Sequence, residues 1–384
     1  MRILQVSPYA MERRGGVQNH VRDTARWLAD AGHDVAIVAP GPGGRGEADG
    51  IGDGVRFLPL GRPITIGLSG TRFELTWVSR RELRDAARVL DAASIDVVHL
   101  HTPFVPLLPA RLWRAFGRPV VATFHATLPP QDRLLAAVLG PVARAMRDRA
   151  TAVIAVSSSA ARLIEPARPG HPIDLLPPAI DLAPWRAAAD AAPRRDPACP
   201  RRLLFLGRFE ERKGLDVLVA AWPEIVRRSG PTPPELVVAG GGELAPRVEA
   251  LVARGPGRVT IVPTPSDGEA RRLVAEADLM VAPAPWGESY GLVLVEAMAA
   301  GTPVVAAANP GYAGVMTGPG EPCLVPPGDA GALAARVVDL LADPLRLDAL
   351  RSWGRERSLD ADVSRLGPRL VEIYRDVVAR RPRV

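Results

Sequence analysis

Two glutamates eight residues apart, Glu288 and Glu296, flank a turn and an apolar run that follow a strand-like segment. If Leu292 begins a helix, the free backbone N–H groups at its start can bind a phosphate at the carboxyl end of that strand. Glu288 then precedes the helix, and Glu296 lies about two turns along it. The backbone groups expected to face the phosphate belong to Tyr290, Gly291 and Leu292. This arrangement suits a sugar nucleotide; the alternative is a buried strand–turn–helix with two solvated glutamates.

A cationic segment gives the second indication of chemistry. Lys213 is the only lysine in the chain, and it shares the segment 207–214 with Arg208, directly after the apolar segment 203–206. Open α/β sheets bind ligands at the carboxyl ends of their strands, so both cations are placed where a ligand would lie. A bidentate guanidinium beside a compact ammonium suits a diphosphate that gains negative charge as its bond to sugar breaks. The alternative is a surface loop with ordinary charges.

These residues give the chain a resemblance to a known family. It resembles the retaining glycosyltransferases of the GT-B fold, in the group with an E-x7-E motif, glycosyltransferase family 4. Glu288 and Glu296 have the motif's spacing, and Arg208 with Lys213 matches the family's diphosphate-binding pair. The N-terminal segments look most like the phosphatidylinositol mannosyltransferases. The resemblance runs nearly end to end, including the segments 6–9, 15–20, 121–125 and 296–305.

The resemblance implies an α/β fold, GT-B, with two doubly wound Rossmann-like domains facing a central cleft. It also implies same-face attack, with Glu288 gripping sugar hydroxyls and Glu296 the ribose. Arg208 and Lys213 would stabilise the leaving diphosphate. His125 would help position the sugar, although a histidine at a strand end is otherwise a common structural hydrogen-bonding group. The remaining implied contacts are Gly16 with the donor diphosphate, and Tyr9, Gln18 and His20 with the acceptor.

The resemblance also implies substrates. The relatives that look most similar use GDP-mannose, so the predicted reaction moves a hexose, mannose from GDP-mannose, to a membrane-associated, lipid-type acceptor. The segment 264–268, expected near the nucleobase, lacks the lysine of the mannosyltransferases, and the segment 60–64 replaces their inositol-phosphate loop. Arg62 in that loop still offers a phosphate contact. A UDP-sugar-dependent transferase with a soluble or polysaccharide-precursor acceptor, a GT-B-type sugar-nucleotide epimerase and a non-catalytic sugar-nucleotide sensor remain alternatives.

No metal cofactor is expected. Asp360 and Asp362 mimic a metal-binding D-x-D, but they directly precede a helical pattern, where acidic residues cap naturally. His99 and His101 point to one face of a strand end. This placement could suggest a metal pair, but no third ligand of obvious spacing accompanies them, so we expect the two histidines to pack and to line the cleft.

Length and pattern predict two α/β domains. Residues 1–180 form the expected acceptor domain and 181–361 the nucleotide-sugar domain, with a Pro- and Ala-rich linker near 166–200. In the family, the final helix, within 362–384, packs back on the first domain. Short β-branched apolar runs alternate with helical segments, as in parallel sheets buried on both faces. The expected strands are 3–6, 35–39, 96–100, 120–124, 152–156, 203–206, 236–239, 259–262, 279–282 and 304–306, with a helix over 17–31.

The formal net charge of +6 belongs to the N-terminal half, because residues 1–180 carry 22 Arg against 16 Asp and Glu. Basic amphipathic segments at 80–90 and 133–149 indicate either contact with an anionic membrane or ordinary surface helices. No pattern indicates nucleic-acid binding. Two cysteines without metal or redox spacing, and no signal-like or membrane-spanning apolar run, favour a cytoplasmic protein, either free or peripheral on the membrane. Oligomeric state is not predicted.

Overall fold

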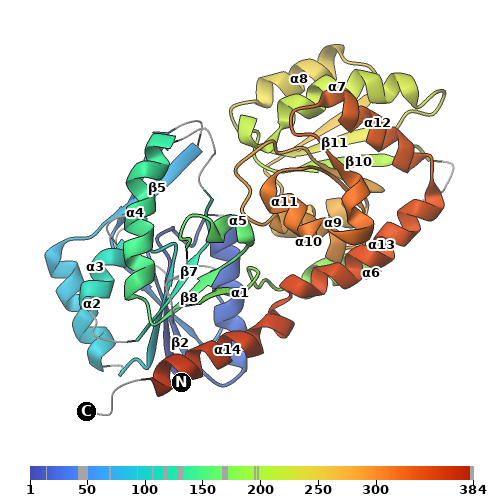
Figure 1. Cartoon of the computed structure of the whole chain (residues 1–384). Coiled ribbons are helices and arrows are strands. Elements are labelled where there is room, and N and C mark those ends of the chain that lie inside the picture. The colour runs from blue at the N-terminus through green and yellow to red at the C-terminus, as the bar shows by residue number, and fades with distance from the viewer. Residues whose placement is uncertain are drawn as a thin grey trace. The chain divides into compact units, whose positions relative to one another are not determined.

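The computed structural model describes residues 1–13, 15–41, 51–68, 71–92, 94–105, 108–115, 119–127, 133–166, 172–193, 196 and 199–380. The chain divides into two compact units, of which the first comprises Met1–Asp181 with Ala361–Val384 and the second Leu182–Asp360. Each unit is built on a parallel sheet whose strands alternate with helices along the chain (Figure 1).

The first unit contains a seven-stranded parallel sheet in the order β3-β2-β1-β6-β7-β8-β9. Strand order reverses between the neighbours β1 and β6, and ligands of open α/β sheets bind at such a switch point. The carboxyl ends of β1 and β6 are therefore the expected place for a site in this unit. The strands are β1 (Arg2–Val6), β2 (Asp34–Ala39), β3 (Val55–Pro59), β6 (Val97–His101), β7 (Val120–Phe124), β8 (Ala152–Ala155) and β9 (Ile173–Leu175).

Helices cover both faces of this sheet. Successive residues of a strand point to opposite faces, so apolar strand residues contribute to a core on each side. Ile3 belongs to the core that packs under α1 (Gly16–Asp30) and α14 (Val363–Ala379). Leu4 belongs to the opposite core, which packs under α2 (Arg80–Ala92) and α3 (Leu108–Ala115). Both faces are thus apolar, as the continuous β-branched runs predict. The other helices of the unit are α4 (Arg133–Arg149) and α5 (Ser158–Ala161).

An antiparallel hairpin of β4 (Arg62–Leu68) and β5 (Thr71–Trp77) lies outside the main sheet. Arg62 was expected to lie in a loop, and that expectation is wrong. Arg62 begins β4, where it pairs in register with Trp77. A proline and a glycine inside β4 obscured an alternation of apolar residues that would otherwise have indicated a strand.

The second unit contains a six-stranded sheet in the order β12-β11-β10-β13-β14-β15, with all pairs parallel. Strand order reverses between β10 and β13, which are paired neighbours. Loops that follow these two strands therefore lie side by side at the switch point. The strands are β10 (Arg202–Leu206), β11 (Glu235–Gly240), β12 (Arg258–Pro263), β13 (Leu279–Ala282), β14 (Val304–Ala307) and β15 (Leu324–Val325).

The second unit's helices fill the connections between these strands. Trp222 of α7 is fully buried, and its indole Nε1 donates to the Pro256 carbonyl over 2.7 Å. The helices are α6 (Ala183–Ala191), α7 (Leu215–Arg228), α8 (Ala245–Arg254), α9 (Asp267–Ala275), α10 (Leu292–Ala299), α11 (Pro310–Val315), α12 (Ala330–Leu341) and α13 (Pro344–Ser358). Short 3-10 turns, η2 (Glu211–Lys213), η3 (Gly318–Cys323) and η4 (Leu359–Ala361), complete the unit.

The expected strands are all present, with ends within one residue of the predicted ones. The strands that were not predicted are β3, β9 and β15, in addition to β4 and β5 of the hairpin. The expectation that 166–200 is a linker is wrong in part, because this stretch contains β9 and α6. Its residues 167–171, 194–195 and 197–198 lie outside the described part of the chain.

Two chain segments meet where the polypeptide leaves and re-enters the first unit. The amide of Ile180 donates to the Ala361 carbonyl over 3.0 Å, and the amide of Val363 donates back to the Ile180 carbonyl over 2.8 Å. Asp362 caps α14, its carboxylate accepting from the Ser364 amide at 2.9 Å. The capping interpretation of Asp362 is confirmed.

Candidate active site

The loop between β13 and α10 holds the two spaced glutamates. Helix α10 begins at Leu292, as predicted, and Gly291 is its N-cap with φ of 108°. A Cβ on Gly291 would lie 2.6 Å from Cδ1 of Tyr312, so glycine is required both by conformation and by space. Glu296 lies four residues after Leu292, which is about one helical turn and not the two turns expected.

The loop after β10 contacts the loop after β13 through their backbones. Gly214 follows turn η2 as its C-cap, has φ of 72° and is also the N-cap of α7. A Cβ on Gly214 would lie 2.1 Å from the carbonyl oxygen of Pro283. This close approach is open only to glycine, and it places the cationic segment directly beside the residues that lead to Glu288.

Opposite charges meet where the two loops touch. Lys213 Nζ lies 2.6 Å from Glu288 Oε1, and Arg212 Nη1 lies 3.4 Å from the same oxygen. Arg212 also donates to the carbonyl of Gly287 over 3.3 Å. These three charged side chains are only 12–21% exposed. The structure thus brings together Lys213 and Glu288, two of the predicted catalytic residues, and adds Arg212.

Arg208, the other predicted cation, is arranged differently. Its Nη1 lies 2.8 Å from Glu210 Oε1, and its side chain is half exposed. No role was predicted for Arg212 or Glu210, although both lie within the segment 207–214. Their position between Arg208 and Lys213 was the signal that could have drawn attention to them.

Helix α11 packs against the loop between β13 and α10 that carries Glu288. The Asn309 side chain accepts from the Tyr312 amide at 2.9 Å and donates to the Ala284 carbonyl at 2.8 Å. A Cβ on Gly311 would lie 2.3 Å from the backbone oxygen of Glu288. The backbone of Glu288 is therefore packed directly on α11, and its position depends on that helix.

In the first unit, three of the predicted acceptor residues, Tyr9, Gln18 and His20, lie at or near the switch point between β1 and β6. Tyr9 follows β1, and its amide donates to Ser7 Oγ over 3.2 Å. Gln18 and His20 belong to the first turns of α1 and are 8% and 4% exposed. Gly16 is the first residue of α1 after its N-cap, Gly15. The remaining predicted acceptor residue, Arg62, is exposed at the start of β4.

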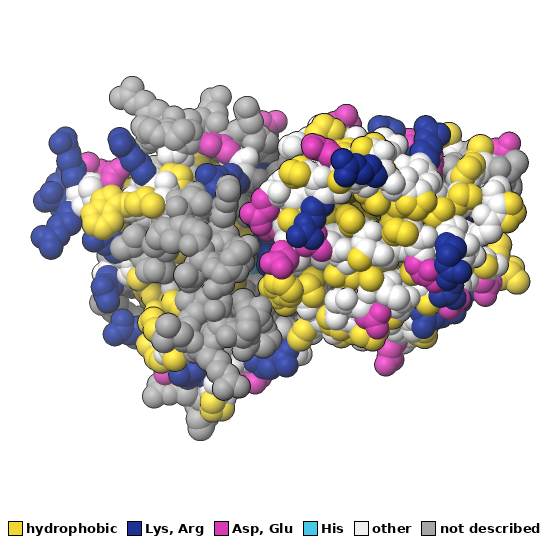
Figure 2. Space-filling model, turned by 90° about the horizontal axis from the view of Figure 1, so that it is seen from above, with side chains coloured by type: hydrophobic (Ala, Val, Ile, Leu, Met, Phe, Trp, Pro, Cys, Tyr) yellow, Lys and Arg dark blue, Asp and Glu magenta, His cyan; other side chains and the backbone are white. Residues whose placement is uncertain are grey.

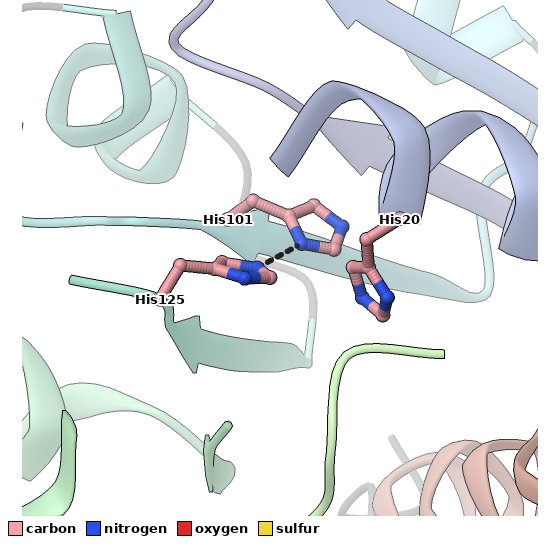
Figure 3. A group of neighbouring side chains, drawn as sticks. All are labelled: His20, His101 and His125. Atoms are coloured by element: carbon pink, nitrogen blue, oxygen red, sulfur yellow. Dashed lines mark hydrogen bonds between the residues drawn. The ribbon is translucent and has the colours of Figure 1, made fainter. Parts of the chain in front are cut away.

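His125 lies in a group of histidines from separate elements (Figure 3). It follows β7, and its Nε2 lies 3.0 Å from Nδ1 of His101, the last residue of β6. The ring centroid of His20 lies 5.3 Å from that of His101 and 5.1 Å from that of His125. His101, which was expected to pack and to line the cleft, thus contacts the residue predicted to position the sugar.

His99 lies behind this group and has a structural role. Its Nδ1 is 2.7 Å from the hydroxyl of Tyr374 in α14, and its Nε2 is 2.6 Å from Thr123 Oγ1. Its ring lies 4.1 Å from that of His101. The expectation that His99 packs in the interior is confirmed.

Burial keeps these rings uncharged near neutral pH. Desolvation lowers the pKa of His20 to about 4. The hydrogen bond to the Ala179 carbonyl raises this pKa, but by less than burial lowers it. Desolvation likewise holds the pKa values of His99, His101 and His125 well below the usual range. A neutral imidazole both donates and accepts, so the described group can transmit hydrogen bonds but is a poor source of positive charge.

Comparison with known proteins identifies the family. A model of "Glycosyltransferase Family 4" matches residues 14–184, and one of "Glycosyl transferases group 1" matches residues 200–343. Phosphatidyl-myo-inositol mannosyltransferase of Propionibacterium freudenreichii is 33% identical over 97% of this chain and 94% of its own length. The chain belongs to glycosyltransferase family 4. The protein of the same name from Mycolicibacterium smegmatis is 32% identical over 98% of this chain and 94% of its own length.

Other members of the group have different names. Glycogen synthase of Mycobacterium tuberculosis is 30% identical over 97% of this chain and 94% of its own length. Among solved structures, sucrose-phosphate synthase from Thermosynechococcus elongatus has a TM-score of 0.74 at 25% identity, covering 98% of this chain and 99% of its own. Anabaena HepE with UDP-glucose has a TM-score of 0.70 at 18% identity, covering 98% of this chain and 100% of its own. The protein is therefore a glycosyltransferase with the GT-B fold, as the sequence predicted.

Proposed function

We propose that this glycosyltransferase transfers mannose from GDP-mannose to the inositol headgroup of phosphatidyl-myo-inositol, with retention at the anomeric carbon. The observation that carries the proposal is similarity over nearly the full length to proteins named for that reaction, at 32–33% identity. The charged contact of Lys213 with Glu288 supplies the chemistry such a reaction needs.

The second unit binds the donor in this proposal. Lys213 and Arg208 neutralise the diphosphate as it leaves, and the N–H groups of Tyr290, Gly291 and Leu292 face its oxygens. Glu288 holds hydroxyls of the sugar, and Glu296 holds the ribose. Because side chains provide the positive charge at the leaving group, the proposal requires no metal cofactor there.

Arg212 extends this donor site beyond the residues predicted from sequence. It is only 13% exposed, and it contacts both the carboxylate of Glu288 and the carbonyl of Gly287. Glu210 also lies 3.7 Å from Arg212, so three cations, Arg208, Arg212 and Lys213, contact two carboxylates and leave positive charge in excess beside Glu288. That excess favours a bound diphosphate.

The first unit binds the acceptor. We assign Tyr9, Gln18 and His20 to the acceptor because all three are placed at the end of the sheet where strand order reverses. His125, which follows β7 at the same end, helps to position the transferred sugar. Arg62 offers a guanidinium to the acceptor phosphate, from the start of β4.

The surface of α2 supports contact with a membrane that carries the acceptor. Its apolar side packs on the core through Leu83, Ala86 and Ala87. Its outer side exposes Arg80, Arg81, Arg84 and Arg88, together with Val89 at 53% exposure. Figure 2 shows such dark-blue side chains gathered at the end of the first unit, beside exposed hydrophobic ones. Arginines beside apolar side chains are suited to the headgroup region of an anionic bilayer.

Trp77, just before α2, adds to this surface. Its side chain is 53% exposed, and the guanidinium of Arg111 lies 5.3 Å from the ring centroid. Indole rings are favoured at the boundary between membrane and water. No helix in the described part of the chain is long and apolar enough to span a bilayer. The exposed arginines of α2 and the exposed indole of Trp77 lead us to propose a peripheral membrane contact through these residues.

A second candidate is a transferase that uses a UDP-sugar and a soluble or polysaccharide-precursor acceptor. The full-length similarity to glycogen synthase is the observation that favours it. The two candidates are separated by incubating the full chain with GDP-mannose or UDP-glucose, each with phosphatidylinositol vesicles or with glycogen. The proposal expects mannosylated lipid in one combination only. Glucose incorporated into glycogen, with no labelled lipid, would overturn it.

A further inference from the structure

Three buried histidines from three different elements converge in the first unit. They are His20 of α1, His101 at the end of β6 and His125 after β7 (Figure 3). One ring nitrogen from each can be chosen so that the three atoms all lie within 4.8 Å of one another. No carboxylate or thiol of the described residues joins this group.

The hydrogen bonds of the group leave nitrogen lone pairs unused. His20 Nδ1 lies 2.9 Å from the carbonyl of Ala179, which can only accept, so this nitrogen carries the proton and Nε2 keeps its lone pair. His101 is fully buried, and its Nε2 has no hydrogen-bond partner among the described residues. Among the described residues, the His101 ring is therefore hydrogen-bonded only through Nδ1, which faces Nε2 of His125.

We propose that His20, His101 and His125 form a binding site for a divalent transition-metal ion of the zinc class, with one nitrogen from each ring. Zinc–nitrogen bonds of about 2.0–2.1 Å place the nitrogens of a tetrahedral site roughly 3.3 Å apart. Nδ1 of His101 and Nε2 of His125 are already 3.0 Å apart. Ring rotations and shifts on the order of 1 Å then bring His20 into the same coordination sphere.

The surroundings favour zinc-class metals over calcium or magnesium. Neutral imidazoles are the preferred ligands of zinc, cobalt and nickel, whereas calcium and magnesium prefer oxygen. The carbonyl of Ala179 holds His20 in the tautomer that a metal needs. The ring of His99, fixed by Thr123 and Tyr374, packs against His101 and restricts its rotation. With three protein ligands, the fourth position stays open to water or another small ligand.

A bound metal would inhibit the transferase, and this part of the inference rests on the proposed function. The metal takes one nitrogen each from His20 and His125, which the proposed function assigns to acceptor and sugar. It also replaces the hydrogen bond between His101 and His125, and the proton of that bond moves to the other nitrogen of its own ring. Metal binding and acceptor binding therefore compete, although the reaction itself needs no metal.

The test is a titration of the full, untagged chain with Co²⁺, followed by visible absorption. Wild type is expected to bind one equivalent with the absorption of a four- or five-coordinate cobalt–histidine site, and Zn²⁺ should bleach it. His101→Gln should abolish the signal, while circular dichroism reports whether the variant is folded. His33→Ala is the matched control, since His33 is a histidine of the same unit outside the group.

Failure of wild type to bind Co²⁺ would overturn the site, whatever the fold of the variants. Binding that persists unchanged in both His101→Gln and His125→Ala would overturn it as well, because the metal would then lie elsewhere. The inhibitory role has its own test. Zn²⁺ should remove at least nine-tenths of the transfer activity, and a chelator should restore it; full activity at saturating Zn²⁺ would overturn that role alone.

Discussion

Lys213 Nζ lies 2.6 Å from Glu288 Oε1, so the chain's only lysine is paired with the first glutamate of the E-x7-E motif. The pair joins the loops that follow β10 and β13, the two strands between which the sheet order reverses. A cation assigned to the diphosphate and a carboxylate assigned to the sugar are thus positioned by the same contact. When donor binds, the ammonium can be shared between Glu288 and a phosphate oxygen.

The single lysine makes this site open to selective labelling. Pyridoxal 5′-phosphate with borohydride should modify only Lys213 and the α-amino group of Met1. Lys213 is 21% exposed, so it is accessible to the reagent. A nucleoside diphosphate should protect Lys213 and leave the labelling of Met1 unchanged, as peptide mass spectrometry will show. Loss of activity should follow the label on Lys213. Equal labelling of Lys213 with and without nucleotide would place the diphosphate elsewhere.

Two glycines of α11 provide a matched pair for testing the support of Glu288. A Cβ on Gly311 would meet the Glu288 carbonyl oxygen at 2.3 Å, whereas a Cβ on Gly314 meets nothing within 4 Å. Gly311→Ala should therefore displace Glu288 and lower kcat/KM by about 100-fold, a loss that a shift of roughly 1 Å can cause. Gly314→Ala should keep full activity, measured by the same transfer assay. Equal activities would show that the position of Glu288 does not depend on α11.

Much of the arrangement was predictable because its signals are local. The run Val120–Phe124 is short, β-branched and apolar, and it forms β7 with those bounds. The helix start at Leu292 follows from the glycine before it and the apolar run after it. Chemistry at the carboxyl ends of β10 and β13 could be predicted without knowledge of which strands are neighbours.

What could not be predicted depends on strand order and on contacts between distant residues. The sequence does not show that β10 and β13 are neighbours in the sheet. The direct contact of Lys213 with Glu288 could therefore not be predicted from it. The sequence showed no further ligand near His101 because its partners, His20 and His125, are distant along the chain and belong to other elements. The β4–β5 hairpin was missed because Pro63 and Gly67 interrupt its alternation.

The buried histidines predict a loss of stability in acid. The pKa of His20 falls from 6.5 in the unfolded chain to about 4 in the fold, because burial disfavours the charged ring. Its contribution is therefore fully present above pH 6.5 and is lost as pH falls through about 4. The full effect for a shift of this size is roughly 3 kcal/mol.

The effect of His20 is measured as the difference in acid-induced loss of stability between wild type and His20→Asn. Asp23 acts in the opposite direction, because burial raises its pKa from 3.8 to about 6 and its stabilising effect is lost as pH rises through that range. Guanidinium unfolding at pH 7 and 4.5 should show a smaller loss on acidification for His20→Asn than for wild type. The same loss in both would mean that His20 is not held neutral in the fold.

The hydroxyl of Tyr374 should contribute to the attachment of α14. It lies 2.7 Å from Nδ1 of His99, and both side chains are buried. Tyr374→Phe leaves that nitrogen without its partner, so the free energy of unfolding should fall by about 1–3 kcal/mol. Arg375→Ala, on the exposed side of the same helix, should change it by less than about 0.5 kcal/mol. Denaturant unfolding of the two variants measures the difference.

We propose that the Lys213–Glu288 site transfers mannose to an inositol lipid. The most direct measurement is the mass of lipid recovered from vesicles, with and without phosphatidylinositol, after incubation with GDP-mannose and the full chain. Wild type should add one hexose to phosphatidylinositol, and Lys213→Ala should reduce the rate by about 10²–10³-fold, as expected when one charge-stabilising group is lost. Arg228→Ala, an exposed cation on α7, should match wild type. Unmodified phosphatidylinositol in every reaction, or equal product from wild type and Lys213→Ala, would contradict the account.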